Sequence, residues 1–471
     1  QSAIPGDMVK TTLVSLIANN AEYEPQNEIS AQLTVKKGKS GTFSVGKNGD
    51  YATIQAAIDD IATGIDGPTV INIATGEYNE LVTVPEIAGT SETNTITLQS
   101  ESGNYADVTI FYDHYSEPPY SDDKMAEEYG VFTFSGVDYF TLKNVTVTTT
   151  DLTFPSVVHV RNKSRHCTVD HCHVYAERSE SATGTDINLI YQYAKNEADC
   201  NNDHFAVRNS LIEGGYIGLR IAGTSFVALP KQVGSLVENN TFRNQGSKSL
   251  YSPSRDIDFT IRGNVFENTE TQKTDFQAID IETSEGLIVE SNSFYINLPV
   301  YATAMNIRKA SGTAEKHGRI VNNEIALTSP GASTTTGIKL NSPSSCLDIA
   351  YNTVLVTGDA ELGGGVALYI NDQMTDMTVR NNILQVEDGG VVYRFYKETC
   401  IDGIAFSNNV LSTTGTSFAK TSSSTTIDTY EDWVQRSGET NSINRAVTFL
   451  SSSILYPADE SILSQAMPLD F

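Results

Sequence analysis

One short pattern of apolar and polar positions returns along the second half of the chain. It consists of an apolar residue, any residue, a polar residue or glycine, Asn, any residue and a second apolar residue. The Asn positions are Asn240, Asn264, Asn292, Asn323, Asn352, Asn382 and Asn409. Neighbouring copies lie between 24 and 31 residues apart. A repeat of this length is typical of a solenoid of stacked units rather than of a globular core.

The residues within one period indicate which solenoid this is. Residues 277–297 contain three short extended runs, 278–282, 287–290 and 293–297, which are separated by polar turns. Their residues are β-branched, aromatic or alternating, and no helical period of 3.6 is present. Three strands per coil, with coils stacked about 4.8 Å apart, predict an all-β, right-handed parallel β-helix. We expect about eleven or twelve coils over roughly 65–415.

The repeated Asn is expected to be structural. A side-chain amide in the same turn of every coil can bond to the coils above and below, and so satisfies polar groups that are otherwise buried unpaired. The turn position extends back from Asn240 through Asn209 to Cys172. We therefore assign no ligand to these Asn residues.

The chain is expected to form one long domain with capped ends. Residues 1–44 lack the coil pattern and are predicted to be a leader or capping segment, followed by a single β-helix domain at 45–471. Residues 54–62 predict a short helix with an apolar face and with Thr53 as its N-cap, suited to plug the open end of the core. After Leu411 the composition shifts to Ser and Thr, and Trp433 is predicted to anchor a closing segment rather than to hold a sugar.

The N-terminal coils resemble a known family. Segments 45–59, 68–73 and 76–85 resemble the opening of pectin methylesterases and related pectin-lyase-like β-helix proteins, although the later Gln-Asp-Thr and Asp-Phe-Ile-Phe-Gly motifs of the esterases are absent. The resemblance therefore supports the fold and not esterase activity. The run at 89–98 resembles secreted bacterial cell-surface β-helix proteins. This resemblance implies an extracellular or cell-surface location, secreted or associated with the outer membrane.

Composition and charge limit the classes of partner that the protein is expected to bind. The 58 acidic and 31 basic residues give a net charge of −27, which argues against nucleic acid or an anionic membrane as a partner. No apolar run has the length of a membrane span, and we expect a monomer. The five cysteines are odd in number and irregularly spaced, which predicts buried free thiols. A single bridge, Cys167 to Cys200 or Cys172 to Cys200, is the alternative.

A cluster of histidines invites comparison with a zinc site. His159, His166, His171 and His173 lie near Cys167, Cys172 and Asp170. Strand alternation places His171 and His173 on one face and Cys172 on the other, which argues against a closed tetrahedral set. We expect solvated or turn histidines here and no metal site.

Candidate chemistry lies on the first strand of each coil. Aligned by their inward apolar pairs, these strands give the outward column His159, Arg220, Asp280, Asn306, Lys339, Tyr369 and Arg394. One outward step further along, the residues are Arg161, Ala222, Glu282, Arg308, Asn341, Asn371 and Tyr396. Side chains of a strand alternate, so both columns should share one surface.

The composition of these columns suits a groove for a sugar chain. Arg and Lys can pair with uronate carboxylates, and Tyr can stack on sugar faces. We predict substrate binding by His159, Arg161, Arg220, Asn306, Tyr369, Asn371, Arg394 and Tyr396. Catalysis is assigned to Asp280, Glu282, Arg308 and Lys339. Asp280 and Glu282 are expected to form an acid/base pair or to bind calcium, the one cofactor that the sequence suggests. Arg308 and Lys339 are expected to supply the group that neutralises the uronate carboxylate and the base that removes the C5 proton.

Two functions from different classes remain open. In the first, the protein is a secreted or cell-surface enzyme that binds and cleaves an acidic polysaccharide, as a lyase in preference to a hydrolase or esterase. In the second, it is a non-catalytic surface module that binds glycans like an adhesin or acts as a structural spacer. Ordinary outward polar positions, stabilised by opposite charges on neighbouring coils, would also produce such columns.

Overall fold

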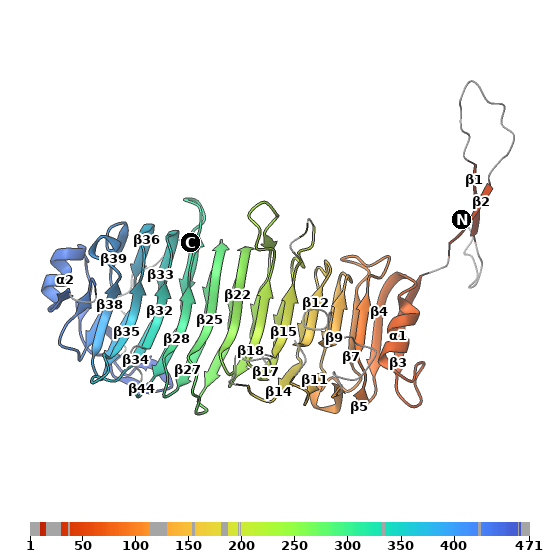
Figure 1. Cartoon of the computed structure of the whole chain (residues 1–471), viewed down its shortest axis with the longest axis horizontal. Coiled ribbons are helices and arrows are strands. Elements are labelled where there is room, and N and C mark those ends of the chain that lie inside the picture. The colour runs from red at the N-terminus through yellow and green to blue at the C-terminus, as the bar shows by residue number, and fades with distance from the viewer. Residues whose placement is uncertain are drawn as a thin grey trace, which may run out of the picture.

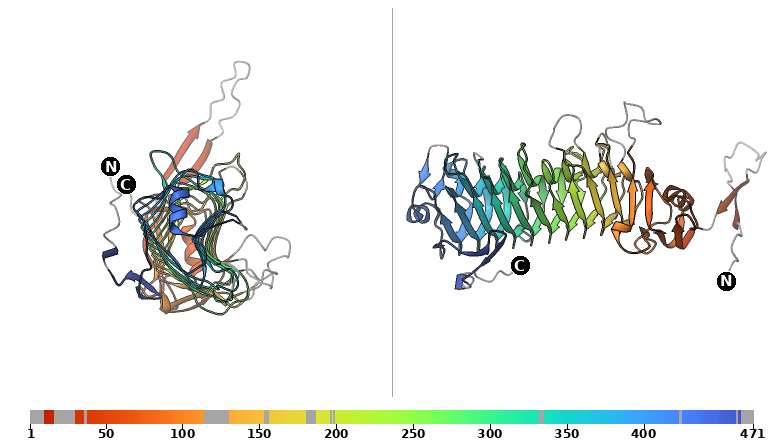
Figure 2. Two further views of the ribbon diagram at one scale, coloured as in Figure 1. Left: turned by 90° about the vertical axis from the view of Figure 1, so that its left-hand side faces the viewer. Right: turned by 90° about the horizontal axis from the view of Figure 1, so that it is seen from below.

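The computed structural model describes residues 10–15, 30–35, 38–113, 130–152, 156–179, 187–195, 197, 199–331, 335–422, 425–459 and 461–462. Strands lie side by side along a long rod, with α1 (Ile54–Ile61) toward one end and α2 (Tyr430–Ser437) at the other (Figure 1). Seen along the rod, the coils superimpose around one elongated core (Figure 2). The protein is a right-handed parallel β-helix, as the repeat predicts.

Each coil contributes a strand to each of three faces. The first face contains β6 (Val82–Pro85), β9 (Gly130–Ser135), β12 (Ser156–Arg161), β15 (Asn188–Tyr193), β18 (Ile217–Ala222), β22 (Lys248–Ile257), β25 (Phe276–Glu285), β28 (Ala302–Ile307), β32 (Thr335–Leu340), β35 (Gly365–Ile370), β38 (Gly390–Phe395) and β41 (Ala419–Lys420). The long strands β22 and β25 continue around the corner, where they pair with the short strands β19 (Gln232–Val233) and β29 (Ala310–Ser311).

The second face contains β3 (Lys39–Val45), β4 (Ile65–Ile73), β7 (Ile96–Ser100), β10 (Phe140–Lys143), β13 (Thr168–Asp170), β16 (Ala206–Arg208), β20 (Leu236–Glu238), β23 (Thr260–Arg262), β26 (Ile288–Glu290), β30 (Gly318–Val321), β33 (Ser344–Ala350), β36 (Met374–Arg380) and β39 (Ile404–Ser407). The third face is a sheet of its own, with β5 (Gly76–Asn79), β8 (Val108–Phe111), β11 (Thr146–Thr149), β14 (His173–Ala176), β17 (Leu211–Gly214), β21 (Thr241–Arg243), β24 (Val265–Asn268), β27 (Ser293–Asn297), β31 (Glu324–Thr328), β34 (Thr353–Thr357), β37 (Ile383–Glu387), β40 (Val410–Thr413) and β43 (Ile443–Asn444). The 13 strands of this described sheet exceed the eleven or twelve coils expected.

The predicted Asn column forms a continuous hydrogen-bonded ladder. The side-chain amide of Asn323 donates to the Val289 carbonyl at 3.0 Å and to Oδ1 of Asn352 at 2.9 Å. Its own Oδ1 accepts from the backbone and side-chain amides of Asn292 at 3.0 and 2.9 Å. Each Asn therefore joins its coil to the coils on both sides.

One assignment in this column was wrong. The ladder position before Asn240 is occupied by Ser210 and not by Asn209, because the Ser210 amide donates to Oδ1 of Asn240 at 3.0 Å. The Ser210 hydroxyl in turn accepts from the amide of Cys172 at 3.0 Å. Asn209 has a φ of 53°, the left-handed conformation that Asn tolerates in a tight turn.

The N-terminal helix closes the core as predicted. Thr53 accepts the Ala56 amide at 3.1 Å as N-cap, and the predicted apolar face of α1 is fully buried. Before it, β1 (Lys10–Ser15) and β2 (Ser30–Val35) pair antiparallel. β3 pairs in parallel with β4, so the paired strands of the coil stack begin at Lys39.

The C-terminal end is closed by α2. Trp433 is fully buried as the predicted anchor, and its ring stacks on Tyr393 with centroids 4.6 Å apart. Its indole N–H donates to the buried carboxylate of Glu439, which also accepts the Asn409 amide at 2.9 Å and so ends the ladder. Short β42 (Thr426–Ile427) runs antiparallel to β41.

Beyond α2 the chain folds back along the rod (Figure 2). The hairpin of β44 (Phe449–Ser451) and β45 (Ile454–Pro457) places Leu455 against Ala326 and Leu355 of the third face. All five cysteines are free thiols, three of them buried and Cys200 and Cys346 half-buried, so neither alternative bridge forms. Neither described helix has the length or apolar composition of a membrane span.

Candidate functional site

The predicted outward column lies on adjacent first-face strands. In the register of the sheet, each residue of the column pairs with the next on the adjacent coil, in the order Arg220, Tyr251, Asp280, Asn306 and Lys339. The column continues through Tyr369 to Arg394. The inward pairs used for the alignment are all buried. The predicted residues therefore lie on one side of the coil stack, because register in a parallel sheet fixes which side chains are neighbours. Asp280 and Asn306 are nevertheless buried there.

Two coils of this surface were missed. β15 and β22 insert Tyr191 and Tyr251 on either side of Arg220, and β22 also contributes Lys248. We define the first-strand strip as Tyr191, Arg220, Lys248, Tyr251, Asp280, Glu282, Asn306, Arg308, Lys339, Tyr369, Asn371, Arg394 and Tyr396. Eight successive coils spaced about 4.8 Å apart make the strip about 34 Å long.

The centre of the strip is a charged network around Asp280. The Asp280 carboxylate is fully buried and lies 2.7 Å from Nζ of Lys248 and 3.3 Å from Nη2 of Arg308. It also accepts the side-chain amide of Asn306 at 2.8 Å. Arg308 bonds in addition to Glu282 at 2.7 Å. Because two cations and an amide surround Asp280, this carboxylate positions its neighbours and does not face solvent as a general acid or base would.

The Asp280 and Glu282 pair does not fit a calcium site. The guanidinium of Arg308 bonds to both carboxylates, so the positive charge between them is already supplied by the protein. Calcium needs several oxygen ligands around one point, and a guanidinium in that place excludes them. The pair stabilises Arg308 instead.

Tyrosine and cation stacks flank this network on both sides. On one side the Arg220 guanidinium lies 4.9 Å from the Tyr191 ring centroid and 5.5 Å from that of Tyr251. Nζ of Lys248 lies 4.1 Å from the Tyr251 ring. Such contacts hold the cations in place and add about 0.5 to 2 kcal/mol each.

On the other side, Lys339 and Arg394 contact the Tyr369 ring, at 5.3 and 5.0 Å from its centroid. The Tyr369 hydroxyl donates to Asn371 at 2.8 Å. Burial raises the pKa of both Tyr251 and Tyr369, so their hydroxyls stay neutral. Tyr396 is 63% exposed and extends the strip toward solvent.

His159 was wrongly placed on the accessible surface. Its side chain is fully buried, with Nδ1 3.0 Å from the Ser156 hydroxyl and its ring edge on Tyr191. Burial lowers the pKa of His159 to about 3, so its imidazole is neutral and does not bind an anion by charge. Tyr191 is also buried, so the partly exposed part of the strip begins at Arg220. Arg161, two residues further along β12, is half-buried.

The other three histidines of the predicted cluster have separate partners. His166 stacks between Tyr139 and His204, with centroids 4.5 Å away on each side. His171 bonds to Asp170 at 2.7 Å, and His173 to Glu213 at 3.1 Å. Over the ranges described above, these histidines form no group of three ligand atoms.

Comparison with known proteins gives similarity of fold. No family model and no curated protein matches the chain. Among solved structures, a mannuronic-acid-specific polysaccharide family 6 lyase from human gut microbiota has 12% identity over 86% of this chain and 91% of its own, with a TM-score of 0.46. A family 6 alginate lyase has 13% identity over 90% and 56%, also with a TM-score of 0.46. PfbA, a surface adhesin of Streptococcus pneumoniae, has 14% identity over 70% and 86%, with a TM-score of 0.43. At these identities the likeness extends to neither residues nor activity.

Proposed function

We propose that this protein binds a chain of acidic polysaccharide along the first-strand strip. The observation that carries the proposal is the pair of tyrosine and cation stacks on both sides of the Asp280 network. Five cations and two carboxylates lie on the strip, whereas the whole chain has a net charge of −27. Local positive charge on an acidic protein favours an anionic ligand at that place alone.

The strip offers the contacts that a uronan needs. Arg and Lys bind carboxylates directly, and the exposed ring of Tyr396 offers an apolar face for a sugar ring. We include lyase chemistry in the proposal. Arg308 would neutralise the uronate, and Lys339 on the next coil, in its neutral form, would remove the C5 proton. The released electron pair would form the C4–C5 double bond as the C4–O bond breaks, and the leaving oxygen would take a proton from water. We further propose an extracellular or cell-surface location and a place among the pectin-lyase-like β-helix proteins.

The binding test uses alginate and polygalacturonate, with a neutral β-glucan as the control ligand. Lys339→Ala combined with Arg394→Ala is expected to weaken binding of the polyanion at least tenfold, because both cations of the Tyr369 stack are lost. Raising the salt concentration should weaken binding by the parent as well. Titration calorimetry measures the effect of the substitutions and the effect of salt on the affinity. Each titration is repeated with calcium present. We avoid substituting Arg308 here, since its loss also destabilises the buried Asp280.

A matched control removes two charges from another face. Lys143→Ala with Arg262→Ala deletes half-exposed cations of the second face and should leave binding unchanged. Equal affinity of parent and Lys339/Arg394 variant, or no affinity for either uronan, would contradict the proposal. Ultraviolet absorbance of unsaturated products then separates a lyase from a binding module: absorbance that grows with time identifies the enzyme, and binding without it identifies the non-catalytic form.

A further inference from the structure

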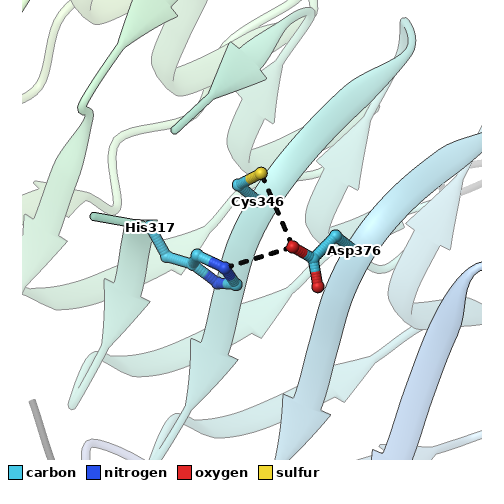
Figure 3. Close-up of side chains that lie close together, drawn as sticks. All are labelled: His317, Cys346 and Asp376. Atoms are coloured by element: carbon cyan, nitrogen blue, oxygen red, sulfur yellow. Dashed lines mark hydrogen bonds and ion pairs between the residues drawn. The ribbon is translucent and has the colours of Figure 1, made fainter. Parts of the chain in front are cut away.

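A second group of reactive side chains lies outside the strip, at the edge of the second face. His317 directly precedes β30, Cys346 lies in β33 and Asp376 lies in β36 (Figure 3). In the register of these strands, Gly318 pairs with Leu347, and Ser345 with Thr375. The three residues therefore occupy the same position in three successive coils, which directs their side chains toward one point.

The distances between the ligand atoms fit a tetrahedral metal ion. Nε2 of His317 lies 3.5 Å from Oδ2 of Asp376, and Sγ of Cys346 lies 3.7 Å from the same oxygen. One ligand atom from each residue can be chosen such that all lie within 4.8 Å of one another. Tetrahedral zinc with bonds of about 2.0 to 2.3 Å places neighbouring ligand atoms about 3.3 to 3.7 Å apart. The two edges at Asp376 match this geometry.

The surroundings orient the histidine as metal sites require. Nδ1 of His317 is buried and faces Asp348, with Oδ2 of that carboxylate 3.3 Å away. The other oxygen of Asp348 accepts the Thr378 hydroxyl at 2.5 Å and lies 3.9 Å from Arg380. A carboxylate behind a histidine fixes the tautomer that leaves Nε2 free to bind metal. Asp348 is thus placed as the positioning residue of this site.

We propose that His317, Cys346 and Asp376 bind one Zn²⁺. Imidazole, thiolate and carboxylate are all zinc ligands, and three protein ligands leave a fourth position for water. Asp376 is 56% exposed and Cys346 half-buried, so an ion can enter from solvent. A cavity of about 420 Å³, lined in part by His317 and Asp348, adjoins the site. The proposal is independent of glycan binding, since the site lies on a different face.

The test loads the chelator-treated full-length protein with Zn²⁺ or with Co²⁺ as a spectroscopic probe. We expect one equivalent per chain and, with Co²⁺, a thiolate charge-transfer band together with the visible absorption of a tetrahedral ion. Cys346→Ser should abolish the charge-transfer band, and His317→Ala or Asp376→Asn should remove stoichiometric binding. Asp348→Asn should weaken affinity by about 10- to 100-fold without removing the band at saturation.

Cys200→Ser is the matched control, because Cys200 is also a half-buried free thiol and should leave the band unchanged. Far-ultraviolet circular dichroism of each metal-free variant verifies that the coil stack is intact. Binding of less than one equivalent, a charge-transfer band that survives Cys346→Ser, or zinc affinity that survives all three ligand substitutions would overturn the proposal.

Discussion

Asn323→Leu should lower the free energy of unfolding by several kcal/mol and lower the melting temperature markedly. The substitution removes the acceptor of two Asn292 amide groups and the donor to the Val289 carbonyl, all of them buried. Each buried polar group left without a partner costs about 1 to 3 kcal/mol. Leucine keeps the branched shape of asparagine but has a larger volume, so local overpacking adds to the loss of hydrogen bonds. Thermal and urea denaturation followed by circular dichroism measure the effect.

The neighbouring residue is the control. Asn322 is exposed, and its amide contacts the Ser291 hydroxyl at 3.0 Å outside the ladder. Asn322→Gly keeps a residue that accepts its φ of 55°, so stability should change by less than about 1 kcal/mol. If the two variants melt at the same temperature, the ladder is not what holds the coils together.

Asp256→Asn should stabilise the protein above pH 7 and have little effect near pH 4. Burial raises the pKa of Asp256 in β22 from 3.8 to about 7, and the carboxyl bonds to the Ser252 hydroxyl. Between pH 3.8 and about pH 7, the Asp256 carboxyl keeps its proton in the folded protein but has lost it in the unfolded chain. Stability therefore falls as pH rises from about 4 to 7, and the penalty is complete above pH 7. At about 1.4 kcal/mol per pH unit, the total is on the order of a few kcal/mol.

The measurement is the melting temperature from pH 4 to 8, with Asp258→Asn as control. Asp258 lies two residues further along, and its side chain is 53% exposed and paired with Lys316. His159 changes stability with pH in the opposite direction, and it does so equally in the parent and in Asp256→Asn. Its lowered pKa makes stability fall as pH falls from about 6.5 to 3. A constant difference between parent and Asp256→Asn across the range would show that Asp256 does not titrate in the folded state.

Alternation and repeat spacing predicted most of the architecture. The directions of side chains such as Ile279, inward, and Asp280, outward, were predicted correctly. A strand has only two faces, and its pairing with neighbouring strands fixes the register. The pattern could not reveal which outward positions are covered, and His159 was misplaced for that reason. The strand at Lys248 was missed because Pro253 interrupts it, where the structure has a register shift.

The metal-ligand group was also missed, although a signal for it exists. His317, Cys346 and Asp376 lie 29 and 30 residues apart, the same spacing that separates Asn323, Asn352 and Asn382. In a solenoid, residues one period apart are neighbours in space. Searching for reactive side chains at the coil period, rather than in short motifs, would have brought these three together. Asp348 could not be found in this way, since its role depends on the direction of the His317 ring.

The closure at α2 also determines how these molecules can associate. A parallel coil stack whose last turn is bare offers backbone donors and acceptors to another molecule, much as the end of an amyloid fibril does. Here the antiparallel β42, the buried Trp433 and the carboxylate of Glu439 occupy the groups on which a next coil would grow. The cap thus opposes end-to-end polymerisation at this end of the rod. A protein that lost it would become a template for filaments while keeping every coil intact.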